Sequence, residues 1–210
     1  MKTRLEFVFG FLGSGKSRFI NAYLDSDICI DEKILIISLE EGNTLINKES
    51  NVKIVFIEEI EYLKEIIIRE VKAYTFDRII VEYNGTISVN SVEDICNDKN
   101  IKRYIDFYGG YFIGNSEEML VYIKNLGELI VPFIQGSKLI ILNNISLISK
   151  EKRDETIKLI KDININSPIV TIDSFSDIDR DIKSNKYFKR NLFIKSLKSL
   201  IKEKINDKMG

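Results

Sequence analysis

The sequence predicts an α/β fold in three layers, with a largely parallel β-sheet and helices on both of its faces. Short β-branched runs alternate along the chain with longer segments whose apolar residues have helical spacing. Several of the short runs are apolar almost throughout, as strands covered on both faces must be. This alternation favours parallel strands joined by crossover helices.

Seven runs are predicted as strands, and each is short enough to be one buried strand. They are Leu5–Phe9, Lys33–Leu39, Val52–Ile57, Arg78–Tyr83, Tyr104–Ile113, Lys138–Leu142 and Pro168–Ile172.

Four segments between these strands are predicted as helices. In one of them Ile60, Leu63, Ile67 and Val71 recur at helical spacing, which predicts one buried face. The four segments are Lys16–Leu24, Glu58–Ala73, Ser116–Ile130 and Lys150–Lys161.

Residues 1–210 are predicted to form a single domain, because the sequence has two prolines, no repeat and no glycine- or serine-rich linker. The segment 185–210 reads as a terminal amphipathic helix with a lysine-rich face. We expect that helix to dock on the domain, although a basic amphipathic helix can also mark a membrane surface or a partner site.

Composition narrows the functional classes. A net charge of −1 over 210 residues gives no reason to expect a nucleic-acid partner. No apolar stretch reaches about 18 residues, so we expect a cytoplasmic protein without stable membrane insertion. The sequence has no histidine, and its two cysteines, Cys29 and Cys96, are far apart and are expected to be reduced packing residues.

The strongest motif is GFLGSGKS at residues 10–17, which matches the P-loop pattern G-x-x-x-x-G-K-[ST] and lies between a predicted strand and a predicted helix. Its glycines allow backbone N–H groups to turn toward phosphate oxygens, and the helix N-terminus adds positive potential. Lys16 would neutralise the β- and γ-phosphates, and the Ser17 hydroxyl would be a Mg²⁺ ligand. The predicted phosphate-binding residues are Gly10, Gly13, Ser14, Gly15, Lys16 and Ser17.

GFLGSGKSRFIN at residues 10–21 resembles the opening segment of the cobalamin-synthesis W-type proteins. These are P-loop GTPases of the SIMIBI class, grouped with the urease and hydrogenase accessory GTPases. The resemblance implies the three-layer P-loop NTPase fold, bound GTP and Mg²⁺, a client protein and a homodimer that closes over the nucleotide. It extends over about residues 5–174, so the chain reads as a shortened, divergent member without the family's C-terminal extra domain.

Later motifs follow in the family's order. Glu40 and Gly42 match its first switch, and Glu82 with Gly85 matches the E-x-x-G that ends its second-switch strand. The resemblance makes Glu40 and Glu82 candidate metal-side residues, with Glu82 also catalytic. The position of Glu82 in the sequence favours the same role. Burying a carboxylate at the end of a strand costs free energy unless a partner such as a metal-bound water or the P-loop hydroxyl compensates its charge. A lysine at the sheet edge would be another such partner, and Gly85 could let a backbone N–H approach a γ-phosphate.

The guanine motif is only partly kept. The family has N-K-x-D at the end of a later strand, and this chain has Asn143, then Asn144 in place of lysine and Ser146 in place of aspartate. In the family that aspartate accepts two hydrogen bonds from guanine, which a serine hydroxyl cannot do. Guanine preference is therefore weak, absent, or supplied from elsewhere, such as Asn143 or the Asp173–Ser174 loop.

Two further departures concern metal and phosphate. The family's C-x-C-C metal motif is missing, since residues 43–67 contain no cysteine or histidine. Glu58, Glu59 and Glu61 read better as a solvated helix start than as a hard-cation cluster. Arg18 replaces a small hydroxyl residue. It contacts phosphate or a neighbouring subunit, or it points into solvent.

The leading hypothesis is a Mg²⁺-dependent nucleoside-triphosphate switch, binding GTP or ATP, whose slow hydrolysis drives metallocofactor delivery or assembly of a partner enzyme. One alternative is a nucleotide-binding interaction module that does not hydrolyse, which the eroded base motif favours. A small-molecule kinase is a weaker alternative, because the clearest lid arginines, Arg180 and Arg190, lie beyond the core motifs.

Overall fold

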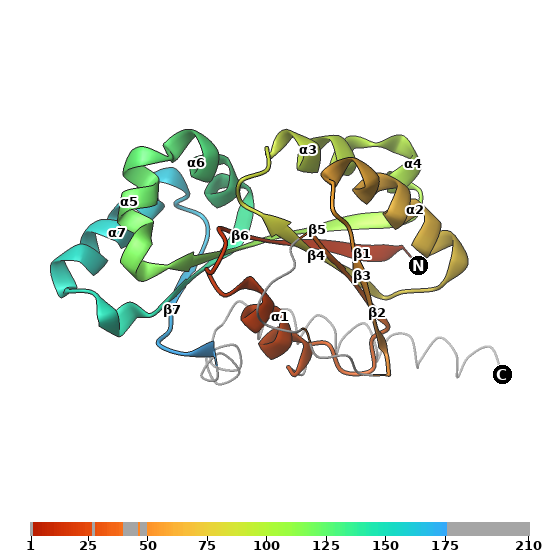
Figure 1. The fold of residues 1–210 in the computed structure, drawn as a ribbon, viewed down its shortest axis with the longest axis horizontal. Coiled ribbons are helices and arrows are strands. Elements are labelled where there is room, and N and C mark those ends of the chain that lie inside the picture. The colour runs from red at the N-terminus through yellow and green to blue at the C-terminus, as the bar shows by residue number, and fades with distance from the viewer. Residues whose placement is uncertain (1, 27, 40–45, 47–49, 176–210) are drawn as a thin grey trace, which may run out of the picture.

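A computed structural model of the chain describes residues 2–26, 28–39, 46 and 50–175. Within them, seven parallel strands form one sheet in the order β3-β2-β4-β1-β5-β6-β7. Helices lie above and below this sheet, so the predicted three-layer α/β fold is confirmed (Figure 1).

All seven predicted strands are present, and no end shifts by more than two residues. The strands are β1 (Thr3–Gly10), β2 (Ile34–Ser38), β3 (Val52–Phe56), β4 (Arg78–Asn84), β5 (Ile105–Asn115), β6 (Ser137–Asn143) and β7 (Ile169–Thr171).

The helices differ more from the prediction. They are α1 (Lys16–Leu24), η1 (Ile60–Tyr62), α2 (Leu63–Ala73), α3 (Asn90–Asn97), α4 (Lys99–Lys102), α5 (Ser116–Asn125), α6 (Gly127–Gly136), η2 (Ile145–Leu147) and α7 (Lys150–Ile163), where η marks a 3₁₀ turn.

The prediction of one helix over Ser116–Ile130 is wrong. Leu126, with φ −124° and ψ 31°, leaves the helical region and separates α5 from α6, which begins at Gly127. Glycine lowers helix propensity, and this favours a break at that point. The helix predicted from Glu58 is also too long, because the α-helical part starts at Leu63 after a 3₁₀ turn.

The helices divide unequally between the two faces of the sheet. Figure 1 shows α1 on one face and α2 to α7 on the other. This follows from right-handed crossovers: β1 to β2 runs toward one edge of the sheet, whereas each connection from β3 onward runs toward the other edge.

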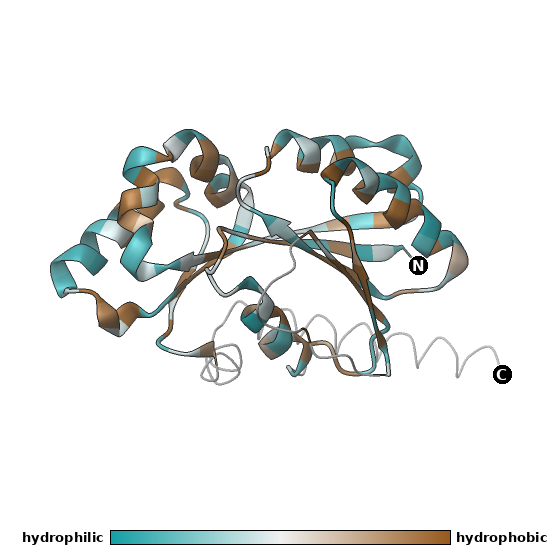
Figure 2. Cartoon of the chain, in the orientation of Figure 1, coloured by the Kyte–Doolittle hydropathy of each residue, from teal (hydrophilic) through white to brown (hydrophobic). Residues whose placement is uncertain are grey.

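Two apolar cores hold the layers together. Strand residues such as Ile80 and Ile141 pack with Phe19 and Ile20 of α1, and on the other face Leu5 and Val81 pack with α2 to α7. Figure 2 shows the strands largely in the hydrophobic colour, while the helices carry hydrophilic residues on their outer sides.

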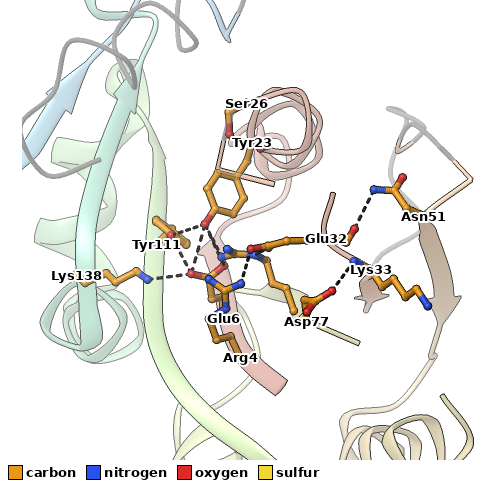
Figure 3. A network of polar contacts seen from close by, with 11 residues as sticks. Arg4, Glu6, Tyr23, Ser26, Glu32, Lys33, Asn51, Asp77, Tyr111 and Lys138 are labelled. Carbon is orange, nitrogen blue, oxygen red and sulfur yellow. Dashed lines mark hydrogen bonds and ion pairs between the residues drawn. The ribbon is translucent and has the colours of Figure 1, made fainter. Parts of the chain in front are cut away.

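A buried ionic network lies on the α1 face of the sheet (Figure 3). At its centre Arg78 pairs with Glu6, and its Nε donates to Glu32 at 2.8 Å. The hydroxyl of Tyr111 and Nζ of Lys138 each donate to Glu6 Oε1 at 3.0 Å. Burial alone would raise the pKa of Glu6, but Arg78 and Lys138 outweigh it and lower that pKa to about 2.

In the part of the chain that the structure describes, no helix has the length and apolar character needed to span a bilayer. The predicted terminal helix at 185–210 lies outside the described residues, as do Arg180 and Arg190.

Candidate functional site

The P-loop (residues 10–17) connects β1 to α1 and includes the first two residues of that helix. Gly10, Gly13 and Gly15 have φ values of 152°, 77° and 97°, and residues with a side chain rarely adopt such values. Gly15 is the N-cap of α1, and no side chain caps the helix there. The first N–H groups of α1 therefore face the inside of the loop, which is the arrangement that binds anions.

Lys16 lies inside this loop. Its side chain is buried, and Nζ donates to the carbonyl oxygens of Gly10 at 2.9 Å and Phe11 at 3.0 Å. These bonds hold the ammonium group across the loop, beside the N-terminus of α1. Positive charge is thereby concentrated where the predicted phosphates would bind.

Glu82, in β4, is hydrogen-bonded both to the P-loop and to the neighbouring strand β2. Its carboxylate is buried and accepts a hydrogen bond from Ser17 Oγ at Oε1 and one from Ser38 Oγ at Oε2, both at 2.6 Å. No lysine or arginine within the described ranges pairs with it, and β4 is an inner strand of the sheet. The lysine-paired edge carboxylate considered from the sequence is therefore wrong.

Gly85 lies directly against the P-loop. Its N–H donates to the Gly10 carbonyl at 3.1 Å, and a Cβ at this position would be 3.0 Å from the Gly10 carbonyl carbon and oxygen. A residue with a side chain would push the two loops apart. From the sequence we expect this N–H to approach a γ-phosphate. To do so, it would have to give up its bond to Gly10 and donate to the phosphate instead.

Asn143 connects the end of β6 to the P-loop. Its Nδ2 donates to the carbonyl of Ser14 at 2.6 Å. Asn143 Oδ1 and Ser14 Oγ are both buried, and neither has a hydrogen-bond partner in the described structure. Buried polar atoms are normally satisfied, so this end of the cradle has the character of a ligand site.

The loops after β6 and β7 meet beside the P-loop. The backbone N–H of Ser146, which stands where the family has its aspartate, donates to Asp173 Oδ1 at 2.8 Å. Phe175 lies next to Gly15, because a Cβ on Gly15 would be 2.7 Å from Cζ of the Phe175 ring.

The structure places the other predicted residues as follows. Arg18 is exposed on the first turn of α1, and no described residue forms a hydrogen bond or ion pair with it. Glu40 and Gly42 lie outside the described residues. Among the residues that are described, no three histidine, cysteine, aspartate or glutamate side chains gather as a metal site.

Sequence reasoning missed Ser38 and Phe175. The signal for Ser38 was strand register, since Ser38 at the end of β2 lies directly opposite Glu82 in β4. Register follows from the order of the strands in the sheet, which the sequence pattern alone does not fix. Nothing in the local sequence marks Phe175, because its contact with Gly15 joins residues at opposite ends of the described chain.

The residues present fit a nucleoside triphosphate with Mg²⁺. The cradle has glycines where a Cβ would intrude, a buried lysine and a helix N-terminus. Ser17 and Glu82 supply hard oxygen donors side by side, the kind that Mg²⁺ prefers.

Comparisons with known proteins show which family and which folds the chain resembles. The family model described as CobW/HypB/UreG, nucleotide-binding domain, matches residues 5–171. The crystal structure of the Zn(II)-bound YjiA GTPase from E. coli superposes with a TM-score of 0.62 at 16% identity, covering 81% of this chain and 57% of that one. The hydrogenase maturation factor HypB from Archaeoglobus fulgidus superposes with a TM-score of 0.55 at 17% identity, covering 93% of this chain and 90% of that one.

The chain thus spans 57% of the YjiA chain. No curated protein matches the sequence. At these identities the two structures support the fold alone, whereas the family model covers more than half of the chain. The chain therefore belongs to the CobW/HypB/UreG family and contains its nucleotide-binding domain.

Proposed function

We propose that this chain is a Mg²⁺-dependent nucleoside-triphosphate switch, GTPase-like, whose slow hydrolysis is coupled to metallocofactor delivery or to assembly of a partner enzyme. The observation that carries the proposal is the hydrogen bond from Ser17 in the P-loop to the buried Glu82 at the end of β4. It brings a P-loop hydroxyl and a carboxylate together beside a phosphate cradle. Family membership supports the same function.

The chain's own groups would act by position and charge. Lys16 and the N-terminus of α1 would hold the β- and γ-phosphates and offset their charge. Ser17 and Glu82 would hold Mg²⁺, which when bound would neutralise charge on the phosphate oxygens. Ser38 fixes the rotation of the Glu82 carboxylate through its second oxygen.

Intrinsic turnover should be slow. The sequence has no histidine, and Tyr83 and Asn84, which follow Glu82, are not strong bases. Without a general base, catalysis rests on electrostatics and positioning, as in P-loop proteins whose intrinsic rates are on the order of 10⁻⁴ to 10⁻² s⁻¹. Slow turnover suits a switch rather than a metabolic enzyme.

The link to metallocofactors rests on relatives. YjiA is described as a Zn(II)-bound GTPase and HypB as a hydrogenase maturation factor. The described part of this chain has no metal cluster of its own, so we propose that it acts on a client protein instead of storing a metal. The cytoplasmic location and a homodimer closing over the nucleotide stay predictions.

The second candidate is a nucleotide-binding module that does not hydrolyse. The observation that favours it is the hydrogen bond from the Gly85 N–H to the Gly10 carbonyl. While this bond is formed, the N–H does not point to a γ-phosphate. A bound triphosphate would then act as a structural signal without being cleaved.

Phosphate release from GTP and from ATP, measured with Mg²⁺ for the wild type, Lys16→Ala and Lys158→Ala, tests the proposal. Lys158 is an exposed lysine on α7 and serves as the control. We expect slow release that falls at least about 100-fold in Lys16→Ala only, because the lysine stabilises the transferred phosphate. If Lys16→Ala weakens nucleotide binding but phosphate release does not depend on Lys16, the second candidate is favoured.

A further inference from the structure

The loops that follow β6 and β7 are fastened to one another next to the P-loop. The Ile172 N–H donates to the Leu142 carbonyl at 2.9 Å, and the Ile145 N–H donates to the Ile172 carbonyl at 3.2 Å. The Ser146 N–H then donates to Asp173 Oδ1 at 2.8 Å. Three successive bonds thus fix the carboxylate of Asp173 against the backbone of Ser146.

This pair of loops also contacts the phosphate cradle, at the neighbouring residues Ser14 and Gly15. Asn143, at the end of β6, bonds to the P-loop carbonyl of Ser14, and Phe175, shortly after β7, lies against Gly15. Asp173 is two residues from Phe175, and its partner Ser146 is three residues from Asn143, so both lie near the cradle. Ligands of open parallel sheets bind at this carboxyl edge of the strands.

We propose that Asp173 is the specificity residue that reads the base, and that it selects guanine. The inference rests on the proposed nucleotide function and names its substrate. The acidic group missing after β6, where Ser146 stands, is supplied by the neighbouring loop after β7.

The chemistry of a carboxylate supports this assignment. A carboxylate has two oxygens with about four acceptor positions, and the bond from Ser146 uses one position on Oδ1. The remaining positions can accept guanine N1–H and its exocyclic amine together. Adenine presents an unprotonated N1 acceptor on the same edge, which a carboxylate repels.

Among the described residues, no cation compensates the charge of Asp173. Asp173 is exposed, and no lysine or arginine in the described part of the chain pairs with it. The Ser146 N–H orients the carboxylate without neutralising it. Recognition of two base donors requires a carboxylate that is held in place and that no described cation neutralises.

Calorimetric titration of the wild type with GTP, inosine triphosphate, xanthosine triphosphate and ATP, each with Mg²⁺, tests the proposal. We expect the wild type to bind GTP at least about tenfold more tightly than ATP, because a site built around polar recognition discriminates strongly. Inosine triphosphate lacks the exocyclic amine and should bind more weakly than GTP.

The Asp173→Asn variant should change the preferred base from guanine to xanthine. The amide oxygen still accepts from N1–H, but the amide nitrogen is a donor that faces guanine's amine unfavourably and suits the 2-carbonyl of xanthine. We expect GTP affinity to fall at least about tenfold and xanthosine triphosphate affinity to rise by a similar factor. Asp162→Asn, an exposed aspartate at the far end of α7, is the matched control and should leave all four affinities unchanged.

Two results would overturn the proposal: an unchanged affinity order in a folded Asp173→Asn protein, or equal binding of GTP, inosine triphosphate and ATP by the wild type. The wild-type comparison needs no variant, so it can overturn the proposal even if Asp173→Asn does not fold. Triphosphate binding that depends on Lys16 but ignores the base would remove this inference and leave the proposed function. No binding of any triphosphate would remove both.

Discussion

The hydroxyl of Ser17 donates a 2.6 Å hydrogen bond to Oε1 of Glu82, linking the first turn of α1 to the end of β4. The two residues are 65 positions apart in the sequence, and they meet because β4 lies beside β1 in the sheet. The proposed Mg²⁺ dependence rests on this buried carboxylate beside the phosphate cradle. Among the described residues, only hydroxyl groups donate hydrogen bonds to it.

Glu82→Gln tests the metal side of the site. The amide keeps the size of the side chain but loses the charge that a hard cation prefers. We expect the gain in nucleotide affinity caused by Mg²⁺ to be lost and phosphate release to fall about 100-fold or more. Nucleotide titrations with and without Mg²⁺ measure this, with Glu93→Gln, an exposed residue of α3, as the control. An undiminished Mg²⁺ effect in Glu82→Gln would contradict the role.

Ser38→Ala tests the second hydroxyl on Glu82. Its loss removes a buried donor, so we expect a cost of about 1–2 kcal/mol in the free energy of unfolding and a three- to tenfold drop in phosphate release. Ser137→Ala is a matched control, because Ser137 is a buried serine whose hydroxyl donates to the Phe133 carbonyl away from the site. If both variants lose stability and release equally, Ser38 has only a structural role.

Gly85→Ala tests the close approach of the second-switch loop to the P-loop. The new Cβ would lie 3.0 Å from the Gly10 carbonyl group and would push the loops apart. We expect nucleotide affinity to fall at least about tenfold, as misplaced binding groups cost that much or more. At Gly127 an added Cβ meets nothing within 4 Å, so Gly127→Ala should bind nucleotide normally. Normal binding by Gly85→Ala would show that the loops tolerate separation.

Glu6→Gln tests the buried network through its pH dependence. The pKa of Glu6 is lowered from 4.5 to about 2, so its charge stabilises the fold fully above about pH 5 and this contribution is lost as the pH falls through 2. The lowering corresponds to about 3 kcal/mol. We therefore expect wild type and Glu6→Gln to differ most near pH 6 and to converge toward pH 2 in urea unfolding. A difference that stays constant over this range would contradict the lowered pKa.

Arg78→Met tests the same network from its other side. Removing the guanidinium takes one of two cations away from buried Glu6 and leaves Lys138 in place, and breaking a buried ion pair costs about 3–5 kcal/mol. Urea unfolding at pH 7 measures this, and Arg153→Met on the surface of α7 should cost little. Equal stability of the two variants would mean that the network does not hold the fold.

The fold was largely predictable, because buried parallel strands and an intact P-loop leave strong local patterns. The strand runs and α1 follow directly from them. The break at Leu126 and the short helices α3 and α4 were not predictable, since tertiary packing decides such short elements.

The site residues that belong to a sequence motif were predictable. Those that reach the site only because their strand pairs with a neighbouring strand were not. Lys16 and Glu82 stand in recognisable sequence contexts, whereas Ser38 contributes only because β2 pairs with β4. The contact of Asp173 with Ser146 likewise depends on the pairing of β6 with β7. Such relationships come from the order of strands in the sheet.

The central claim is that the P-loop holds a nucleoside triphosphate with Mg²⁺ through Lys16, Ser17 and Glu82. Its most direct test is equilibrium titration of the purified chain with labelled GTP and labelled ATP, with and without Mg²⁺, for the wild type and Lys16→Ala. We predict binding of at least one triphosphate that Mg²⁺ strengthens and that Lys16→Ala weakens at least about 100-fold. Binding that is equal in the two proteins, or absent from both, would contradict the account.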